Sequence, residues 1–492
     1  MTLRDLPEAV AADEVRAALV ALGSGDLPTH GGRTLAYVYD SGHPEVDALA
    51  REALAAYAGS NGLDPTAFPS LAAMEREVVG FAARLLDAPD GYAGTVTSGG
   101  TESCLLAVLA ARDARPDLDR PQLVAPTTIH AAFHKAAHLF GLELVLVDVD
   151  PTTFRADPAA MAAAFTDRTV LVAVSAPSYA HGVVDPVGPI AAAAAERDIR
   201  CHVDACIGGW VLPFLDGAGG AGGAEAASTP AWSFAVPGVT SISADVHKYG
   251  YTPKGVSVLV HRSGLLRASQ FWATADWPGY GVVNATLQST KSGGPLAAAW
   301  ATIRSFGGPG YAALARTART ATLEIAAAVD GIPGIRVLAP PDSTLLAVAT
   351  DESCDPYTVV DELLTRGWFA QPQLPFRGGP ASLHLSLSAA TAAHVPDFVD
   401  ALRASVEAAR AAGPVTVDPG LAGLLGSLEP ARLDEPTLAG LLAAAGLAAG
   451  ADASTGEAGL RMPERMAPIH ALLAACPPPL RATLLTAVVG RL

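Results

Sequence analysis

The length, composition and charge of the chain limit the classes of protein to which it can belong. With 492 residues it is long enough for two or three domains with a substantial core. Its net charge of −17 argues against nucleic acid and anionic membranes as partners.

The N-terminal region, residues 1–65, is predicted to be a helical and irregular arm with an amphipathic helix over 13–22. It begins with acidic residues and has no apolar core, so we expect no signal peptide. The longest uncharged stretch near the C-terminus, 436–451, is too short to span a bilayer, so we expect no membrane anchor. Five cysteines without a disulfide framework favour the reducing cytoplasm.

After the arm, strand and helix patterns alternate. This alternation predicts an α/β fold with a mostly parallel sheet, helices on both faces and ligands outside the carboxyl ends of the strands. The expected strands begin at 94 and cover 122–125, 142–149, 170–175, 201–204 and 241–244, and the expected helices cover 71–86, 105–112, 130–140, 158–165 and 190–197.

In the second half of the chain, the regular alternation of predicted strands and helices ends. A low-complexity stretch at 217–228 is expected to form a flexible surface loop. An antiparallel-type strand at 256–262 precedes two helices, 295–306 and 311–329. Later strands (335–338, 344–349, 382–388) and helices (357–365, 394–411) predict an α+β unit. We therefore expect four parts: the arm 1–65, a large domain 66–306, a small domain 307–412 and a helical extension 413–492.

One lysine stands out by its position and by the scarcity of its kind. The chain has four lysines, Lys135, Lys248, Lys254 and Lys291. Lys248 follows the expected strand 241–244, where partial desolvation would make its amine neutral and nucleophilic. A lysine of this kind forms a Schiff base with a carbonyl compound, most often with pyridoxal phosphate.

Two further features favour pyridoxal phosphate as the cofactor. Asp204 ends an apolar run upstream of the lysine, where its carboxylate is placed to pair with a pyridinium nitrogen. The glycine turn before the helix 105–112 can cradle a phosphate at the positive end of the helix dipole, and its residues are Ser98, Gly99, Gly100 and Thr101. The turn has neither Walker nor Rossmann spacing.

Three histidines share one face of the helix 130–140. His130, His134 and His138 are spaced like possible metal ligands. They spread over two turns without a nearby carboxylate or cysteine, so we expect no metal. Stacking of His130 on a cofactor ring is the favoured interpretation.

The longest motifs are TSGGTES (97–103), HAAFHKA (130–136), HGVVDPV (181–187), HVDACIGG (202–209) and GVTSISADVHKYGYTPKG (238–255). From about residue 27 to residue 425 the chain resembles the sphingosine-1-phosphate lyases, within the group II pyridoxal-phosphate-dependent decarboxylases. The resemblance implies fold type I, the aspartate-aminotransferase fold, and a homodimer with shared active sites.

The resemblance also implies roles for single residues. Lys248 would form the Schiff base, Asp204 would pair with the pyridine nitrogen and His130 would stack on the ring. The implied phosphate ligands are Gly100, Thr101 and His247 of one subunit, with Ser292 and Gly293 of the loop 289–294 reaching in from the other.

Two departures from the family bear on the substrate. Asp64, in the turn that contains Asn61, replaces a histidine implicated in binding the substrate phosphate, and a carboxylate there would favour an amine or hydroxyl instead. Lys291 replaces an arginine, which keeps the charge but loses the bidentate fork. Tyr39 matches an active-site tyrosine of the family. All four residues are therefore candidates for substrate contact or catalysis.

The predicted reaction is cleavage of the Cα–Cβ bond of a small β-hydroxy amine into an aldehyde and an amine, with Lys254 or Tyr39 carrying the proton of the hydroxyl. An α-decarboxylase of an L-amino acid is the alternative. His384 lies on the strand where such enzymes usually present an arginine for the α-carboxylate, which disfavours decarboxylation and transamination, but the nearby Arg377 keeps the alternative open. A non-catalytic or metal-binding protein on the same fold is the remaining alternative.

Overall fold

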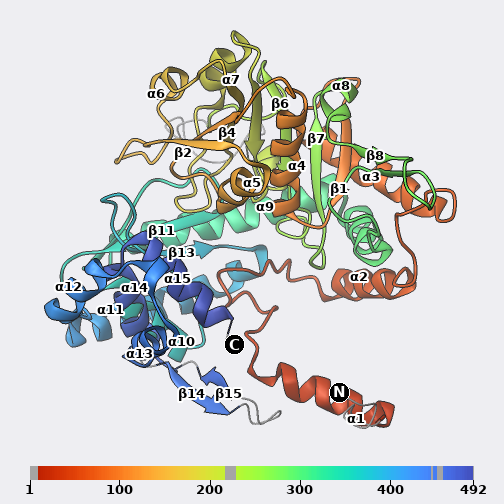
Figure 1. Cartoon of the computed structure of the whole chain (residues 1–492). Coiled ribbons are helices and arrows are strands. Elements are labelled where there is room, and N and C mark those ends of the chain that lie inside the picture. The colour runs from red at the N-terminus through yellow and green to blue at the C-terminus, as the bar shows by residue number, and fades with distance from the viewer. Residues whose placement is uncertain (1–8, 216–228, 445–446, 452–457, 462, 491–492) are drawn as a thin grey trace.

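The computed structural model describes residues 9–215, 229–444, 447–451, 458–461 and 463–490 (Figure 1). The predicted low-complexity loop at 217–228 therefore lies outside the described residues.

The described part of the chain is organised around a seven-stranded sheet with the order β1-β7-β6-β5-β4-β2-β3. The strands from β6 to β3 run parallel, and β7 is antiparallel to both β6 and β1. The bounds are β1 Ala93–Thr97, β2 Gln122–Pro126, β3 Glu143–Val147, β4 Thr169–Ser175, β5 Arg200–Asp204, β6 Val239–Ala244 and β7 Ser257–His261. The mostly parallel sheet is as predicted.

Helices cover both faces of this sheet because the strand side chains alternate between two apolar clusters. On β2, Leu123 packs in the cluster of helices α4 and α5, whereas Val124 packs in the cluster that contains α3 and α7. The helices are α3 Pro69–Leu85, α4 Gly100–Asp113, α5 Ala131–Phe140, α6 Pro158–Ala163, α7 Val187–Ala195 and α8 Gly264–Ala268. The prediction of a doubly covered α/β sheet is confirmed.

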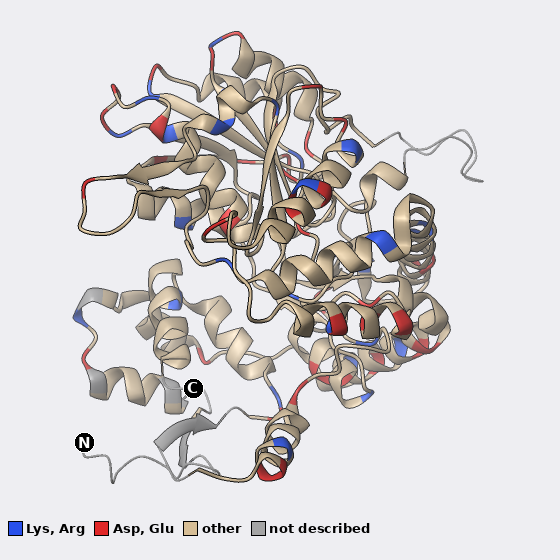
Figure 2. Cartoon of the chain, turned by 90° about the vertical axis from the view of Figure 1, so that its right-hand side faces the viewer, with Lys and Arg blue, Asp and Glu red and all other residues tan. Residues whose placement is uncertain are grey.

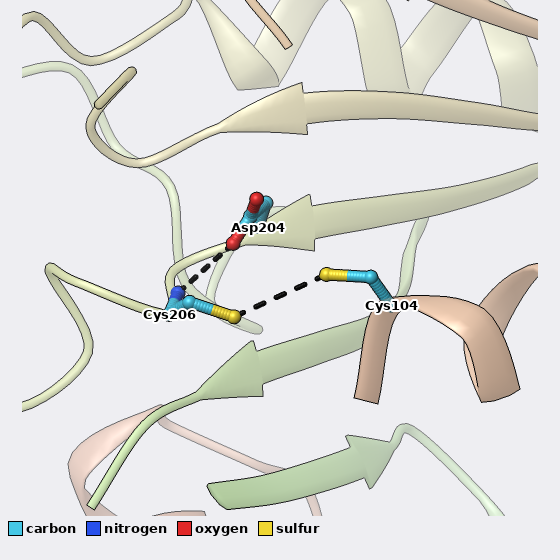
Figure 3. A group of neighbouring side chains, drawn as sticks. All are labelled: Cys104, Asp204 and Cys206. Atoms are coloured by element: carbon cyan, nitrogen blue, oxygen red, sulfur yellow. Dashed lines mark hydrogen bonds between the residues drawn. The ribbon is translucent and has the colours of Figure 1, made fainter. Parts of the chain in front are cut away.

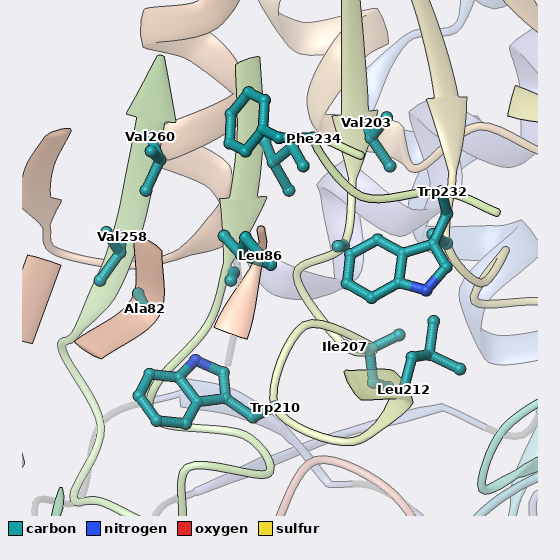
Figure 4. Close-up of a cluster of buried hydrophobic side chains, with 14 of the residues drawn as sticks. Ala82, Leu86, Val203, Ile207, Trp210, Leu212, Trp232, Phe234, Val258 and Val260 are labelled. Atoms are coloured by element: carbon teal, nitrogen blue, oxygen red, sulfur yellow. The ribbon is translucent and has the colours of Figure 1, made fainter. Parts of the chain in front are cut away.

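The larger of the two clusters is centred on aromatic side chains (Figure 4). Trp210, Trp232 and Phe234 are buried against Val203 of β5 and Leu86. Trp210 also stacks on Phe81, with ring centroids 5.6 Å apart. This packing fixes the loop that follows β5 and therefore the residues at the carboxyl end of that strand.

A long helix, α9 Gly293–Asp330, connects the large sheet to a smaller antiparallel sheet of order β10-β11-β13-β12. The two helices predicted here form one element, broken where Gly307 adopts a positive φ of 56°. The smaller unit consists of β10 Ile335–Val337, β11 Leu345–Thr350, β12 Gln371–Gln373 and β13 Ser382–Ser386, with helices α10 Pro356–Thr365 and α11 Val395–Ala412.

The N-terminal arm contains α1 Ala12–Leu22, which buries none of its residues, and α2 Pro44–Ala56, which packs along α9 (Figure 1). A hairpin of β8 Trp272–Thr274 and β9 Val282–Asn284 follows α8. Neither α2 nor this hairpin is among the elements expected from the sequence.

The C-terminal segment is not helical throughout, contrary to the prediction. Besides α12 Pro419–Ser427, α13 Glu435–Ala444, α14 Ala467–Ala475 and α15 Pro478–Val489 it contains a strand pair, β14 Ala448–Ala451 and β15 Ala458–Arg461. The buried carboxylate of Asp361 on α10 joins this segment to the body, since it accepts hydrogen bonds from Met466 N (3.0 Å) and Ala467 N (2.9 Å) at the start of α14.

Most charged side chains lie on loops and outer helices rather than on the central sheet (Figure 2). None of the helices in the described ranges is both long and apolar enough to cross a membrane.

Candidate active site

The candidate site is a cavity of about 380 Å³ at the carboxyl ends of β4, β5 and β6. Their register places Ser175 beside Asp204 and Asp204 beside Ser243, so these three strands end at one edge of the sheet. The cavity is lined by Ser98, Gly99, Gly100, Thr101, Glu102, His130, Ser175, Pro177, Tyr179, Asp204, Cys206, Ile207, Asp245, His247 and Lys248. The structure thus brings together the predicted lysine, aspartate, histidines and glycine turn.

Lys248 lies in the turn after β6 and pairs with a carboxylate that the sequence reading did not assign to the site. Its Nζ is 3.0 Å from Oδ2 of Asp245, which is 2 % exposed. Burial alone would lower the pKa of Lys248, but Asp245 and other neighbours raise it well above its usual value. The expectation of a neutral amine is therefore wrong for this structure, because a buried counter-charge outweighs desolvation.

Asp245 itself is held ionised. Burial would raise its pKa, but the positive charge of Lys248 and the neighbouring His247 bring the pKa below its usual value. Its second oxygen, Oδ1, is buried and accepts no hydrogen bond from a described residue. A buried acceptor without a partner is costly. The site therefore keeps an acceptor free next to Lys248.

Asp204 ends β5 and faces the same cavity. Its Oδ1 accepts a hydrogen bond from Cys206 N at 3.0 Å, which fixes the orientation of the carboxylate. The side chain is buried, with 7 % of the residue exposed, so its charge acts through a medium of low dielectric. A protonated ring nitrogen is a fitting partner for such a carboxylate.

The glycine turn between β1 and α4 packs closely against these carboxylates. A Cβ atom built on Gly100 would lie 2.5 Å from Oδ2 of Asp245 and 2.8 Å from Sγ of Cys206, so only glycine fits. Glu102, which the sequence reading missed, accepts hydrogen bonds from Ser98 N (2.6 Å) and Leu287 N (2.8 Å). The turn is therefore fixed, with the N-terminus of α4 directed at the cavity, as an anion site requires.

His247 is neutral at physiological pH and has a defined tautomer. Burial and nearby lysines, opposed by Asp245, lower its pKa to about 4. Its Nδ1 accepts the backbone N–H groups of Val256 (3.2 Å) and Gly255 (3.3 Å), so the proton resides on Nε2. Nε2–H is therefore available as a donor in the cavity.

The three histidines of α5 do not converge. His130 caps the helix, with Nδ1 accepting Ala132 N at 3.2 Å, and lines the cofactor cavity. His134 lines a different cavity, of about 530 Å³, together with Arg377. Among the described groups of residues that could hold a metal ion, neither His134 nor His138 appears.

Tyr39 and Lys254 are not among the residues that line the cavity, but the charges of Lys248 and Asp245 act on the pKa of both side chains. Lys254 Nζ donates to the carbonyl oxygen of Tyr37 at 2.8 Å and lies 4.9 Å from the centre of the Tyr39 ring. Although Lys254 is exposed by its accessible surface, the protein groups around its amine partly desolvate it, and this desolvation together with the charge of Lys248 lowers the pKa of Lys254 to about 8. Burial raises the pKa of Tyr39. The pair therefore combines an ammonium whose pKa is lowered with a phenol whose pKa is raised, so the phenol keeps its proton.

His384 does not line the cofactor cavity, contrary to its assignment as a substrate residue. It stacks on Tyr179, with ring centroids 4.1 Å apart, and its Nε2 is 2.9 Å from Oγ of Ser386. Burial lowers the pKa of His384 to about 3. It acts as a neutral, fully buried support for Tyr179, which does line the cavity.

The remaining substrate and cofactor candidates lie in the turn that contains Asn61 and Asp64 and in the loop 289–294 at the start of α9, and none of them is among the residues that line the cavity. Lys291 pairs with Glu75 (3.0 Å), and Asn61 forms an isolated β-bridge with Ser292. The exposed Asp64 accepts hydrogen bonds from Thr66 within its own turn. Gly293 N donates to the carbonyl oxygen of Ser60. Within one chain none of them lines the cavity described above.

The residues at the cavity fit pyridoxal phosphate. Each functional group of this cofactor has a matching protein group at the cavity. The amine of Lys248 matches the aldehyde, the buried carboxylate of Asp204 matches the ring nitrogen, and the imidazole of His130 matches the ring face. The N-terminus of α4 and the neutral imidazole of His247 match the phosphate. The close approach of the turn at Gly100, which a Cβ would prevent, and the unsatisfied Oδ1 of Asp245 indicate a built ligand site.

Comparisons with known proteins agree with this chemistry. Residues 33–330 match the pyridoxal-dependent decarboxylase conserved domain, and residues 419–491 match the C-terminal putative HTH domain of pyridoxal-dependent enzymes. Sphingosine-1-phosphate lyase of Dictyostelium discoideum is 36 % identical over 74 % of this chain and 67 % of its own length. Sphingosine-1-phosphate lyase 1 of Rattus norvegicus is 34 % identical over 76 % of this chain and 64 % of its own. The chain thus spans about two thirds of the length of these relatives.

Solved structures of pyridoxal-phosphate-dependent enzymes also resemble this chain. The sphingosine-1-phosphate lyase of Burkholderia pseudomallei superimposes with a TM-score of 0.77 and 34 % identity, covering 83 % of this chain and 94 % of that one. Lactobacillus brevis glutamate decarboxylase, with a TM-score of 0.71 and 19 % identity over 85 % of this chain and 97 % of its own, shows the same fold.

Proposed function

The chain belongs to the family of pyridoxal-dependent decarboxylases, and we propose that within it the protein is a carbon–carbon lyase that cleaves the Cα–Cβ bond of a β-hydroxy amine. The products are an aldehyde and an amine. Because several relatives are named sphingosine-1-phosphate lyases, we infer that the substrate is a long-chain amine.

The observation that carries this proposal is the set of cations at the site. Among the described residues that line the cofactor cavity there is no arginine. Arg377, the candidate for binding an α-carboxylate, directs Nη1 to Asp148 at 2.6 Å and lines a separate cavity. A bidentate carboxylate contact is the usual way to hold an amino acid. A substrate without an α-carboxylate therefore fits this site better.

The residues around the cavity divide the binding task among themselves. Lys248 would be the point of covalent attachment, Asp204 would keep the ring nitrogen protonated and His130 would lie against the ring. The N-terminus of α4 and the Nε2–H of His247 bind the phosphate. When bound, pyridoxal phosphate supplies an electron sink for the electron pair that is released when a bond to Cα breaks.

Proton transfer is assigned to Lys254 and Tyr39. With a pKa of about 8, Lys254 has a substantial neutral fraction in mildly alkaline solution and can accept the proton of the β-hydroxyl. Tyr39, whose pKa is raised by burial, stays protonated and orients the hydroxyl as a donor. In its protonated form Lys254 makes a cation–π contact with the Tyr39 ring, which keeps the amine beside the phenol.

A homodimer is part of the proposal. The hairpin of β8 and β9 exposes large apolar side chains, including Trp272 (59 %) and Tyr280 (60 %). Exposed aromatic patches of this kind mark interfaces. The hairpin leads into Leu287, which is bonded to Glu102 beside the phosphate turn, and then into the loop 289–294. We propose that a second copy of the chain packs on this hairpin and that the loop 289–294 then also contributes to the partner's cofactor cavity.

A product assay tests the proposed reaction. The protein loaded with pyridoxal phosphate is supplied with phosphorylated and unphosphorylated long-chain β-hydroxy amines and, in parallel, with L-amino acids. We expect aldehyde from a β-hydroxy amine and no carbon dioxide from the amino acids. Carbon dioxide without aldehyde would establish the decarboxylase instead. Comparison of the phosphorylated and unphosphorylated amines shows whether Asp64 is compatible with a substrate phosphate.

A further inference from the structure

Two cysteines form a pair directly behind the cofactor cavity (Figure 3). Cys104 lies on α4 and Cys206 follows β5, and both are free and buried. Their Sγ atoms are 4.0 Å apart. Both side chains point toward each other beneath Asp204 in Figure 3. The pair therefore joins the two elements that carry the phosphate turn and the ring-nitrogen carboxylate.

Cys206 is in contact with two parts of the cofactor site, the carboxylate of Asp204 and the glycine turn. It lines the cavity, and its backbone N–H donates to Asp204 Oδ1. A Cβ on Gly100 would lie 2.8 Å from Sγ of Cys206, so this sulfur packs against the glycine turn. Movement of Cys206 toward Cys104 would disturb the hydrogen bond to Asp204 and the packing of the turn together.

We propose that Cys104 and Cys206 form a reversible disulfide when an oxidant enters the cofactor-free cavity, and that this disulfide weakens the binding of pyridoxal phosphate. A disulfide bond is about 2.05 Å long, so the sulfurs must approach by about 2 Å. Cys206 lies in a loop, whereas Cys104 is fixed within a helix, so Cys206 makes the movement.

The oxidant in this proposal is a peroxide. Hydrogen peroxide converts the Cys206 thiol to a sulfenic acid and releases one water. The Cys104 sulfur then attacks the Cys206 sulfur, the S–O bond breaks and a second water leaves. In total two thiols and one peroxide give one disulfide and two waters. A dithiol reductant reverses the reaction.

The surroundings make the reaction of Cys206 with peroxide slow. The hydrogen bond to Cys104, burial and the carboxylates of Asp204 and Asp245 raise the pKa of Cys206 well above its usual value. The uncharged thiol reacts slowly. Because Cys206 lines the cavity that the cofactor fills, the loaded protein shields the thiol, and the cofactor-free protein exposes it to small oxidants.

The test compares the loaded and cofactor-free full-length protein after treatment with hydrogen peroxide and a chelator, which removes metal ions that could bind the same thiols. Peptide mass spectrometry locates the cross-link, and thiol titration in denaturant counts the free cysteines. We expect a Cys104–Cys206 cross-link in the cofactor-free protein alone. The affinity for pyridoxal phosphate, measured by visible absorbance, should fall about tenfold or more, as loss of one strong hydrogen bond predicts. Dithiothreitol should restore it.

Matched variants separate this pair from general oxidation. Cys104→Ala should form no such cross-link and should bind the cofactor equally well before and after peroxide, whereas Cys201→Ala, which removes another buried cysteine on β5, should behave like the unchanged protein. The proposal is overturned if no Cys104–Cys206 cross-link forms, if the cross-linked protein binds the cofactor with unchanged affinity, or if loaded and cofactor-free protein cross-link equally fast. None of these readouts depends on the identity of the substrate.

Discussion

The charge of Lys248 depends on a carboxylate three residues earlier in the chain. Asp245 Oδ2, 3.0 Å from Nζ, stabilises the ammonium and so opposes the neutral form that must attack a carbonyl carbon. An uncharged side chain at 245 would remove the largest influence that raises the pKa of Lys248 and leave burial, which lowers it.

The variant Asp245→Asn should therefore allow pyridoxal phosphate to attach at lower pH. The rate at which visible absorbance appears after mixing cofactor-free protein with cofactor should rise with pH in both proteins, with the rise shifted to lower pH in the variant. Glu75→Gln, which removes a carboxylate outside the cavity, is the control. An unchanged pH profile in Asp245→Asn would contradict the role of the ion pair.

The pKa of Lys254 provides a second prediction about a single residue. Its neutral form increases as pH rises through about 8, so the rate of cleavage should increase over that range and then level off. Lys254→Met should lose this dependence and slow the reaction about 100-fold, the size expected of one general base. The exposed Lys135→Met serves as the matched control. Retention of the pH dependence in Lys254→Met would assign the base to another group.

The turn from β1 into α4 depends on glycine for space. Gly100→Ala would place a methyl group against Asp245 and Cys206. We expect cofactor affinity to fall about tenfold or more, with far-ultraviolet circular dichroism unchanged. Gly188→Ala on α7, where a Cβ meets no neighbour within 4 Å, is the control. Full cofactor affinity in Gly100→Ala would show that the turn is looser than described.

Helix α14 depends on one carboxylate of α10. Removal of the buried Asp361 carboxylate would leave the N–H groups of Met466 and Ala467 without their acceptor. Asp361→Ala should cost about 1–3 kcal/mol of local stability and speed amide exchange at the start of α14. Asp351→Ala, at an exposed turn, is the control. Equal exchange in both variants would mean that other contacts hold the C-terminal segment.

The elements that the sequence predicts well are those whose apolar pattern reflects burial. Strands β4 and β5 lie within the sheet, so their continuous apolar runs identify them. The strands β14 and β15 consist mostly of alanine and glycine, which lack both alternation and β-branching, so the sequence predicts helix there instead. The β8–β9 hairpin is short and exposed, so burial leaves no pattern in it.

The same reasoning explains which residues of the site can be predicted from the sequence. Lys248, Asp204 and the glycine turn could be found because each follows a strand, and parallel strands end at one edge of a sheet. The ion pair of Asp245 with Lys248 and the bonds of Glu102 to the turn depend on side-chain directions that spacing does not reveal. His384 was misplaced for the same reason, since its position on β13 is correct but Tyr179 lies between it and the cavity.

At the scale of the whole molecule, the exposed aromatics of the β8–β9 hairpin predict self-association. The protein should have the mass of a dimer in light scattering, because burial of Trp272 and Tyr280 against a second copy removes apolar area from water. The double variant Trp272→Glu and Tyr280→Glu should weaken the dimer, whereas Leu265→Glu, at an exposed site on α8, should not. A monomeric unchanged protein would contradict the proposed interface.

Cleavage of the Cα–Cβ bond is the central claim, and carbon-13 NMR tests it most directly. A β-hydroxy amine labelled with carbon-13 at both Cα and Cβ is incubated with the loaded protein. The coupling between the two labelled carbons should disappear as the substrate is consumed, with one label recovered in an aldehyde and the other in an amine. Consumption of the substrate with the coupling retained would show that the bond stays intact and that the protein catalyses a different reaction.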